Sequence, residues 1–221
     1  IVKDIIDRNP SKIVQTFVQT PLIWGVHVAY NSSYKTIKDL QCKKAAISRY
    51  GSGSHLMAYI KAQNNNWNLD KDLNFEVIKN LDGAVEGLTN KKADYFLWEK
   101  FTTKPLVDNN TFRRIGNCPS PWPCFVIAVR EDFIKSNKED IKTILKIINS
   151  TTKEFKNIPS IDKTIANRYE QKLEDVQEWL SLTEWSQELI SKKTLNNVQK
   201  ELFALNIIPE IVDYKKLTNN L

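Results

Sequence analysis

The 221-residue sequence is poor in the residues that usually hold metals, with only three cysteines and two histidines. The cysteines, Cys42, Cys118 and Cys124, show no Cys-x-x-Cys spacing and have little histidine nearby. We therefore expect no zinc site and no other bound metal. A disulfide between Cys118 and Cys124 is conceivable only in an oxidising compartment.

Long apolar runs are also missing, since no run approaches the roughly 20 residues that cross a bilayer. We expect no membrane span. The first residue is Ile1, without a positively charged leader, and the only methionine is Met57. Because translation normally starts with methionine, we expect the sequence to be the remainder of a longer product, with any export signal before Ile1.

The sequence contains no cluster of charges of one sign. The net charge is +6, but the basic residues are scattered, and runs such as Lys43-Lys44 or Lys91-Lys92 are two residues long. A nucleic-acid partner is not expected, because it would need a concentrated basic face. The 41% hydrophobic content allows one large domain or two small lobes. The basic balance gives weak support to an anionic small ligand.

The most distinctive stretch is residues 48–58, Ser-Arg-Tyr-Gly-Ser-Gly-Ser-His-Leu-Met-Ala, which follows an apolar run and opens a predicted helix. The first N–H groups of a helix have no intrahelical acceptor, and the macrodipole is positive there. This pattern predicts a cradle for an anion or another polar ligand. A merely flexible turn is the alternative.

Catalysis by this stretch is disfavoured. Ser54 and His55 are adjacent, so on a helix their side chains diverge by about 100° and cannot form a nucleophile–base pair. The glycines form no Gly-x-Ser-x-Gly elbow, and no Walker lysine follows Gly53. Hydrolase and phosphoryl-transfer functions are therefore not expected.

The order of elements predicts an α/β fold. Strand-like segments at 44–48, 75–78 and 93–99 alternate with helical segments at 56–64 and 81–90, as in βαβ units of a mostly parallel sheet. Further strands are expected at 13–17, 22–30, 112–115 and 124–129; the first two fit either two strands or one bent crossover. Residues 119–123 are expected to be a rigid proline loop, and the remainder is helical, including 131–150, 160–169, 173–181 and 184–203.

In such sheets, ligands lie at the carboxyl ends of the strands, so residues 48–55 and 98–103 share one edge. Trp98 and Trp122 are either ordinary core anchors or aromatic walls of a ligand cleft. Glu99 either balances a cationic ligand nitrogen or caps the strand end. His27 is expected to be structural, and Trp179 and Trp185 are assigned to helix packing.

Four blocks in this order resemble the type II periplasmic-binding-protein fold: Ser-Arg-Tyr-Gly-Ser-Gly-Ser-His at 48–55, Leu-Asp-Gly-Ala at 81–84, Asp-Tyr-Phe-Leu-Trp-Glu at 94–99 and Pro-Trp-Pro-Cys-Phe at 121–125. More narrowly, the sequence resembles the sulfonate, nitrate and thiamine-pyrimidine binding branch, including cytosolic fungal relatives such as those of Candida. The resemblance implies two α/β lobes that close on a small ligand. It divides the chain into 1–22 (remainder of lobe 1), 23–135 (lobe 2, which binds ligand) and 136–221 (C-terminal helices returning to lobe 1).

The resemblance also implies the ligand residues. It places ligand contacts of lobe 2 in the turn at the helix start, at Ser52, Gly53, Ser54 and His55. Trp98 and Glu99 would lie opposite this turn. Trp24 and Trp122 would lie near the crossover. By the same resemblance, the strand and helix that open the family's first lobe are missing before Ile1. We therefore expect lobe 1 to be incomplete at its N-terminus.

The function implied is capture of an anionic or heteroaromatic solute by hinge closure, with no catalytic residue and no cofactor. A thiamine-pyrimidine synthase-like enzyme using the same cleft is the alternative, although its Cys-Cys-Cys-Phe-Cys segment is absent. We expect a monomer. An ABC transporter would be the partner of an exported protein, which would be periplasmic or a lipoprotein in a bacterium, whereas a fungal relative would be cytoplasmic.

Overall fold

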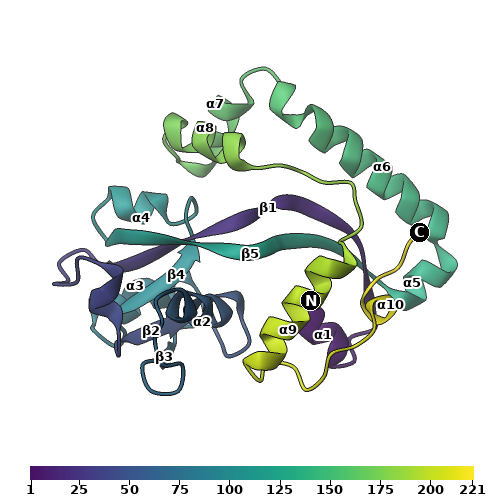
Figure 1. Cartoon of the computed structure of the whole chain (residues 1–221). Coiled ribbons are helices and arrows are strands. Elements are labelled where there is room, and N and C mark those ends of the chain that lie inside the picture. Colours follow the sequence, from purple (N-terminus) through teal and green to yellow (C-terminus); the bar gives the residue numbers. More distant parts are fainter. The chain divides into compact units, whose positions relative to one another are not determined.

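The computed structural model describes residues 1–221, whose contacts divide them into two compact units. Unit 1 comprises Ile1–Pro21 and Pro121–Leu221, and unit 2 comprises Leu22–Ser120. Two long neighbouring strands, β1 (Ser11–Ala29) and β5 (Phe112–Arg130), each continue from one unit into the other (Figure 1). The predicted lobes, which divide at 22/23 and 135/136, stay a prediction.

The sequence folds as a mixed α/β protein, as predicted. Unit 2 contains, in chain order, η1 (Ile37–Leu40), β2 (Lys44–Ile47), α2 (Gly53–Asn64), β3 (Asn74–Val77), α3 (Leu81–Thr89), β4 (Tyr95–Glu99) and α4 (Lys104–Asp108). Unit 1 contains α1 (Val2–Ile6), α5 (Glu131–Ser136), α6 (Lys138–Glu154), η2 (Phe155–Asn157), α7 (Ile161–Tyr169), α8 (Leu173–Leu182), α9 (Lys192–Ala204) and α10 (Tyr214–Leu217). No helix is both long and apolar enough to cross a bilayer.

The sheet has five strands in the order β3-β2-β4-β1-β5. Strand β2 is parallel to β3 and to β4, which confirms the predicted βαβ pattern. Strand β1 runs antiparallel to β4, with Trp24 opposite Glu99 and Val28 opposite Tyr95. The carboxyl ends of β2, β3 and β4 therefore lie at one edge, where the paired part of β1 begins.

One open alternative about the strands is decided and one expectation is corrected. Residues 11–29 form one strand, which is the single-crossover alternative. Residues 112–130 also form one strand, so the expectation of a proline loop at 119–123 between two strands is wrong. Pro121 and Pro123 lack the N–H that a central strand needs. The strand order puts β5 at the end of the sheet, where proline is tolerated because one edge needs no partner.

The core of unit 2 has two layers, because side chains alternate along β4. Tyr95 and Leu97 pack with Val26 and with residues of α2 on one face of the sheet. Phe96 packs with Phe112 and with residues of α3 on the other face. All of these side chains are buried, so each face of β4 has its own covering helix.

Both helices of the βαβ units start at a side-chain cap. The Ser52 hydroxyl accepts from the His55 N–H at 3.3 Å, and the Asn80 side chain accepts from the Gly83 N–H at 2.9 Å. A Cβ on Gly83 would lie 1.9 Å from the Ile78 carbonyl oxygen. Only glycine allows α3 to start this close to the end of β3.

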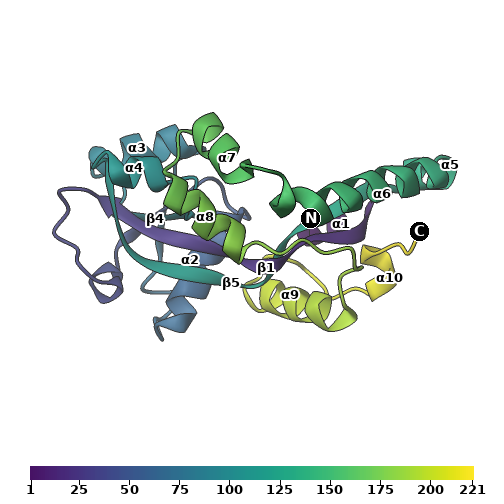
Figure 2. The same ribbon diagram turned by 90° about the horizontal axis from the view of Figure 1, so that it is seen from above.

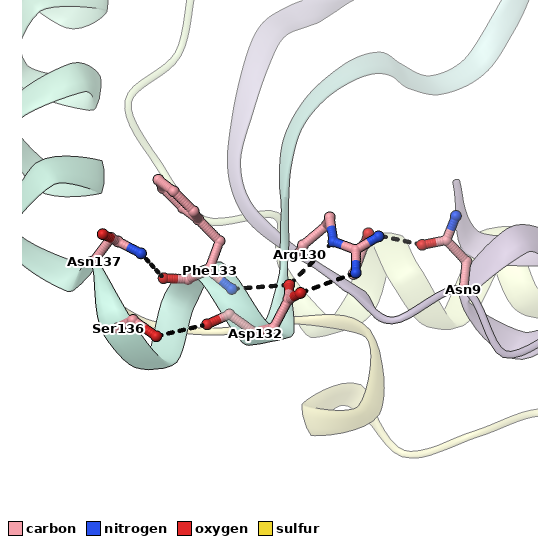
Figure 3. A network of polar contacts seen from close by, with 7 residues as sticks. Asn9, Arg130, Asp132, Phe133, Ser136 and Asn137 are labelled. Carbon is pink, nitrogen blue, oxygen red and sulfur yellow. Dashed lines mark hydrogen bonds and ion pairs between the residues drawn. The ribbon is translucent and has the colours of Figure 1, made fainter.

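In unit 1, a polar network joins the end of β5 to α5 (Figure 3). The Arg130 guanidinium donates two hydrogen bonds to the Asp132 carboxylate, at 3.0 and 2.9 Å. The same carboxylate accepts from the Phe133 N–H at 2.9 Å, and so marks the start of the helix. The pair is solvent-exposed, so it defines the local geometry more than it stabilises the unit.

Helix α6 follows α5 and is the longest helix (Figure 2). Its Ile141 packs with Val14 and Ile134. Further along, Trp185 makes edge contacts with Phe155 and Trp179, at ring-centroid distances of 5.2 and 6.4 Å. These contacts agree with the packing role predicted for the two tryptophans.

The helix predicted at 184–203 is wrong in its first part, because α9 starts only at Lys192. The segment before it pairs with β1 instead. The Thr16 N–H donates to the Glu188 carbonyl at 2.8 Å, and the Ser186 N–H donates to the Phe17 carbonyl at 3.0 Å. These backbone bonds to a strand take the place of a helical turn.

Candidate ligand-binding site

The carboxyl edge of the unit 2 sheet gathers several of the predicted residues. The turn at 48–52 follows β2, and Glu99 ends the parallel strand β4. Trp24 reaches the same edge because it stands opposite Glu99 in the antiparallel register of β1. The structure therefore brings Trp24 to the start of α2, although the two are distant in the sequence.

The start of α2 is rich in unpaired donors. The backbone N–H groups of Gly53 and Ser54 precede the first intrahelical bond, from Leu56 to Ser52, and have no acceptor. The first turn contains no acidic residue. The helix is 12 residues long, so its macrodipole adds positive potential at these donors. The local chemistry suits a ligand that supplies acceptors or negative charge.

The indole of Trp24 covers this helix start. Its Cη2 and Cζ2 atoms lie 3.0 and 3.1 Å from the point where a Cβ on residue 53 would stand. The Trp24 Nε1 is buried and has no hydrogen-bond partner. A Cβ on residue 53 would therefore require the Trp24 ring to shift by a few tenths of an ångström. The ring carries a third donor without a partner.

The serine hydroxyls of the turn are engaged with the protein. The Ser54 Oγ accepts from the Ser48 N–H at 2.9 Å and lies 3.0 Å from the Ser52 Oγ. Ser54 is only 2% exposed. These bonds tie the helix start to the end of β2, so Ser52 and Ser54 shape the turn through their hydroxyls. The Ser52 N–H donates to the Arg49 carbonyl, so of the two serines only Ser54 offers a ligand its backbone N–H.

His55 belongs to an aromatic cluster beside the turn. Its Nδ1 accepts from the Gly51 N–H at 3.1 Å, so the neutral ring carries its proton on Nε2. That Nε2 is buried without a partner, and the ring contacts Tyr50, Tyr59 and Phe75 at centroid distances of 5.2, 4.9 and 4.7 Å. Burial lowers the pKa of His55. The ring therefore stays neutral, which suits packing and excludes a cationic contact to an anion.

Glu99 acts as a cap of the strand end, one of the two roles foreseen for it. Its Oε1 accepts from the Phe101 N–H at 3.0 Å, and its Oε2 accepts from the Thr102 N–H at 2.6 Å and from the Thr102 hydroxyl at 2.7 Å. Both carboxylate oxygens are thus used by the turn that follows β4.

The two other tryptophans lie elsewhere. Trp98 is half-buried on the sheet face of Phe96, at a centroid distance of 5.9 Å, whereas Trp24 packs on the face of α2. The period of two along β4 causes this separation. Trp122 is half-buried in β5, within unit 1. Their roles as ligand residues stay predictions.

His27 is a core residue, as predicted. It is fully buried between Phe96 and Phe112, and its Nε2 lies 2.8 Å from the Thr103 hydroxyl. Burial, followed by the nearby positive charge of Arg114, lowers the pKa of His27 to about 3. The neutral ring thus holds the turn after β4 against the sheet.

Lys61 is a buried residue that was not predicted from the sequence. It is 2% exposed on α2, and its Nζ lies 3.6 Å from the ring centroid of Trp67 and 4.9 Å from that of Tyr95, with no hydrogen-bond partner. Burial lowers the pKa of Lys61 to about 7. Its place in the apolar run of α2, four residues after Met57, was the available signal. Tyr95 begins β4, so this cluster lies away from the carboxyl edge.

A cavity of about 410 Å³ lies beside the start of α3 and includes Lys79, Asn80 and Asp82 in its lining. None of the predicted ligand residues lines it.

The thiol of Cys118 is buried and that of Cys124 is exposed, and the structure contains no disulfide between them. The described residues contain no cluster of three or more histidine, cysteine or acidic side chains that could hold a metal ion.

The fold is shared with solved structures of other proteins. Structures of periplasmic binding proteins match the chain along its length, with the Candida albicans CA3427 gene product, which has the generic periplasmic binding protein fold, at 23% identity and a TM-score of 0.88. This match covers 100% of the present chain and 77% of that one. The chain thus has the periplasmic-binding-protein fold, as the sequence resemblance predicts.

Two sulfonate-binding proteins share the fold. The alkanesulfonate-binding protein SsuA of Xanthomonas axonopodis pv. citri, bound to MOPS, is 13% identical with a TM-score of 0.78, and the match covers 95% of this chain and 73% of that one. The aliphatic sulphonate binding protein SsuA of Escherichia coli is 13% identical with a TM-score of 0.68, over 100% and 73% of the two chains.

A family model matches part of the sequence. Residues 24–118 match the family model described as Ca3427-like PBP, and this range covers nearly all of unit 2. A comparison with the curated proteins finds no match. The matched residues include β2, the turn at 48–52, α2 and β4, which are the elements that form the sheet edge described above.

Proposed function

We propose that this protein binds a small anionic or heteroaromatic solute, and that the start of α2 in unit 2 supplies the contacts to its charged or acceptor-rich end. One observation carries the proposal: the Gly53 N–H, the Ser54 N–H and the Trp24 Nε1 gather at the sheet edge without acceptors. Helix-terminal donors are satisfied by side chains, water or ligands, so three donors without a protein acceptor at one place suit a ligand that brings several acceptors.

The donor set favours a particular chemistry of ligand. Sulfonates, nitrate and carboxylates present several acceptor oxygens and a negative charge, which the helix start can bind through its backbone. A ring nitrogen or carbonyl of a pyrimidine would satisfy fewer of these donors. The alkanesulfonate-binding relative bound to MOPS supports the sulfonate class for this fold.

We further propose that binding acts through hinge closure, with bending of the long strands β1 and β5, which continue from one unit into the other. A ligand stabilises a closed state only to the extent that it binds that state more tightly. No covalent step is needed. In line with this, Ser54 and His55 make no hydrogen bond to each other, and each is engaged elsewhere. The thiamine-pyrimidine synthase-like alternative therefore receives no support from the turn.

The partner of an exported solute-binding protein would be an importer. A related structure is described as the ligand-binding component of an ABC-type import system from Staphylococcus aureus, at 8% identity and a TM-score of 0.76 over 99% of this chain and 75% of that one. We propose an ABC transporter as partner only for a form that is exported. A monomer is the simplest state for this function.

Thermal unfolding with added ligands tests the proposed function. Methanesulfonate, benzenesulfonate, nitrate and an aminopyrimidine would be added separately, and a ligand at 100 times its Kd should stabilise the protein by about 2.7 kcal/mol. We expect a sulfonate to raise the Tm more than the pyrimidine does. An unchanged Tm with every ligand, confirmed by calorimetric titration, would contradict solute binding of these classes.

A further inference from the structure

The turn between β2 and α2 carries an arginine with no structural task. Arg49 is exposed, and its side chain makes no hydrogen bond or ion pair. The other two arginines of unit 2 are used by the fold: Arg113 donates to the carbonyls of Tyr30, Ser32 and Tyr34, and Arg114 donates to the Lys100 carbonyl. Arg49 is thus the only guanidinium of unit 2 that is free to bind a ligand.

The backbone keeps Arg49 beside the helix start. Its carbonyl accepts from the Ser52 N–H at 3.2 Å, which closes the turn directly before the α2 cap. The guanidinium is planar and always charged, and it binds sulfonate or carboxylate oxygens in pairs. It can therefore add charge to the same oxygens that the Gly53 and Ser54 N–H groups bind.

Tyr50 follows Arg49 and is 65% exposed, which is unusual for so large a ring. It contacts His55 and Phe75 at interplanar angles of 80° and 82°, with centroid distances of 5.2 and 6.2 Å. These edge contacts fix the ring and leave most of its surface uncovered. An aromatic surface that is already ordered costs little entropy when it binds a flat ligand.

Independent evidence for a ligand at this place comes from two buried donors. The Trp24 Nε1 above Gly53 has no acceptor, and neither has the Nε2 of His55, a residue that is 7% exposed and lies beside Tyr50. Natural proteins rarely leave such groups unpaired. The helix start is therefore not the only feature that indicates a ligand at this turn.

We propose that Arg49 and Tyr50 determine ligand specificity, and that they select an organic anion whose charged group is attached to a flat apolar group. This inference rests on the proposed function and makes it more specific. Arg49 binds the anionic oxygens together with the α2 backbone, and Tyr50 contacts the flat group. A small inorganic anion lacks the flat group, and a neutral ring lacks the charge.

Three probes separate the two contributions. Benzenesulfonate carries both the charge and the ring, methanesulfonate carries the charge alone, and methyl phenyl sulfone keeps the ring and the S=O acceptors without the charge. Their Kd values would be measured by calorimetric titration of the full chain. We expect benzenesulfonate to bind most tightly of the three.

Matched variants assign the effects to residues. Arg49→Gln should weaken benzenesulfonate by about tenfold to hundredfold, the usual range for a charge-assisted hydrogen bond, and leave methyl phenyl sulfone nearly unchanged. Lys38→Gln removes the same charge from an exposed residue at the other end of β2 and should change neither Kd. Arg49→Lys should restore part of the affinity, because it keeps the charge and loses the planar pair of donors.

Tyr50→Ala should weaken benzenesulfonate more than methanesulfonate, whereas Tyr30→Ala, a change of an exposed tyrosine after the end of β1, should have no effect. Circular dichroism checks that each variant is folded. Wild-type affinity for benzenesulfonate in Arg49→Gln or in Tyr50→Ala would overturn the assigned role of that residue while solute binding stands. Failure of the wild type to bind any of the three probes would overturn sulfonate binding and this inference together.

Discussion

The indole of Trp24 lies directly over Gly53, with its Cη2 3.0 Å from the position of a Cβ that glycine lacks. This contact joins β1 to the start of α2, two elements that the sequence places about 30 residues apart. It also limits residue 53 to glycine if the Trp24 ring is to keep its position.

Gly53→Ala should therefore displace the Trp24 ring and weaken ligand binding. The added methyl improves helix propensity by up to about 1 kcal/mol, so we expect the stability of unit 2 to change by less than about 1 kcal/mol. Intrinsic fluorescence and calorimetric titration would detect the two effects. Gly87→Ala is the matched control, because it adds a methyl to another helix of unit 2, away from Trp24. Equal affinities of Gly53→Ala and wild type would show that the Trp24 contact does not shape the site.

Lys61→Met should stabilise the protein at neutral pH by about 2 kcal/mol, because it removes a buried amine without an acceptor and keeps the length of the side chain. The folded-state pKa of about 7 lies below the ordinary 10.5. The folded state therefore binds the proton more weakly than the unfolded chain, and stability falls as pH decreases from about 10.5 to 7.

Thermal unfolding of wild type and Lys61→Met between pH 7 and pH 10 would measure this difference. The variant should have the higher Tm at pH 7 and a flatter pH dependence. Lys71→Met, a change of an exposed lysine, serves as control. A lower Tm of Lys61→Met at pH 7 would mean that the amine stabilises the aromatic cluster of Trp67 and Tyr95 as a cation.

His27 should make the protein sensitive to acid. Its pKa is lowered from 6.5 to about 3 in the folded state, so stability is fully present above pH 6.5 and is lost as pH falls toward 3. The loss can reach about 1.4 kcal/mol per pH unit for one such group. His27→Leu should lose less stability than wild type between pH 6.5 and pH 4, measured by urea unfolding. Parallel pH profiles of the two proteins would show that His27 is not the group responsible.

Glu99→Gln should lower stability by about 1 kcal/mol and leave the affinity for a sulfonate unchanged, because the carboxylate caps the turn after β4. Urea unfolding and ligand titration would be compared with those of Glu86→Gln, an exposed acid paired with Lys92. If Glu99→Gln abolished binding at unchanged stability, Glu99 would be a ligand residue rather than a cap.

Much of unit 2 is predictable from local patterns. Short β-rich segments separated by capped helices specify β2, α2, β3, α3 and β4, and the turn at residue 52 is visible as small residues before a helix. The sheet edge at which Ser52 and Glu99 lie follows from the parallel order alone. Local sequence patterns therefore suffice to predict which residues lie at the carboxyl edge of the parallel strands.

Long-range pairing is not encoded in the same way. Nothing local shows that residues 184–188 pair with β1 rather than start a helix, because the competing bonds come from residues about 170 positions away. Trp98 and Trp24 lie on different faces of the sheet. The period of two in β4 is visible in the sequence, but the helix that covers each face is not. Lys61 was hidden for a related reason, since its burial depends on Trp67 and Tyr95 together.

The buried thiol of Cys118 has a practical consequence. Burial raises the pKa of this thiol to about 11, whereas Cys42 and Cys124 are exposed. A thiol reagent can reach Cys42 and Cys124 in the folded protein, although the hydrogen bond to Asp72 raises the pKa of the Cys42 thiol and slows its reaction. The reagent should reach Cys118 only when unit 2 opens. The rate at which the Cys118 thiol is modified therefore measures how often unit 2 opens. A ligand that stabilises the folded unit should lower this rate by the same factor by which it lowers the opened population.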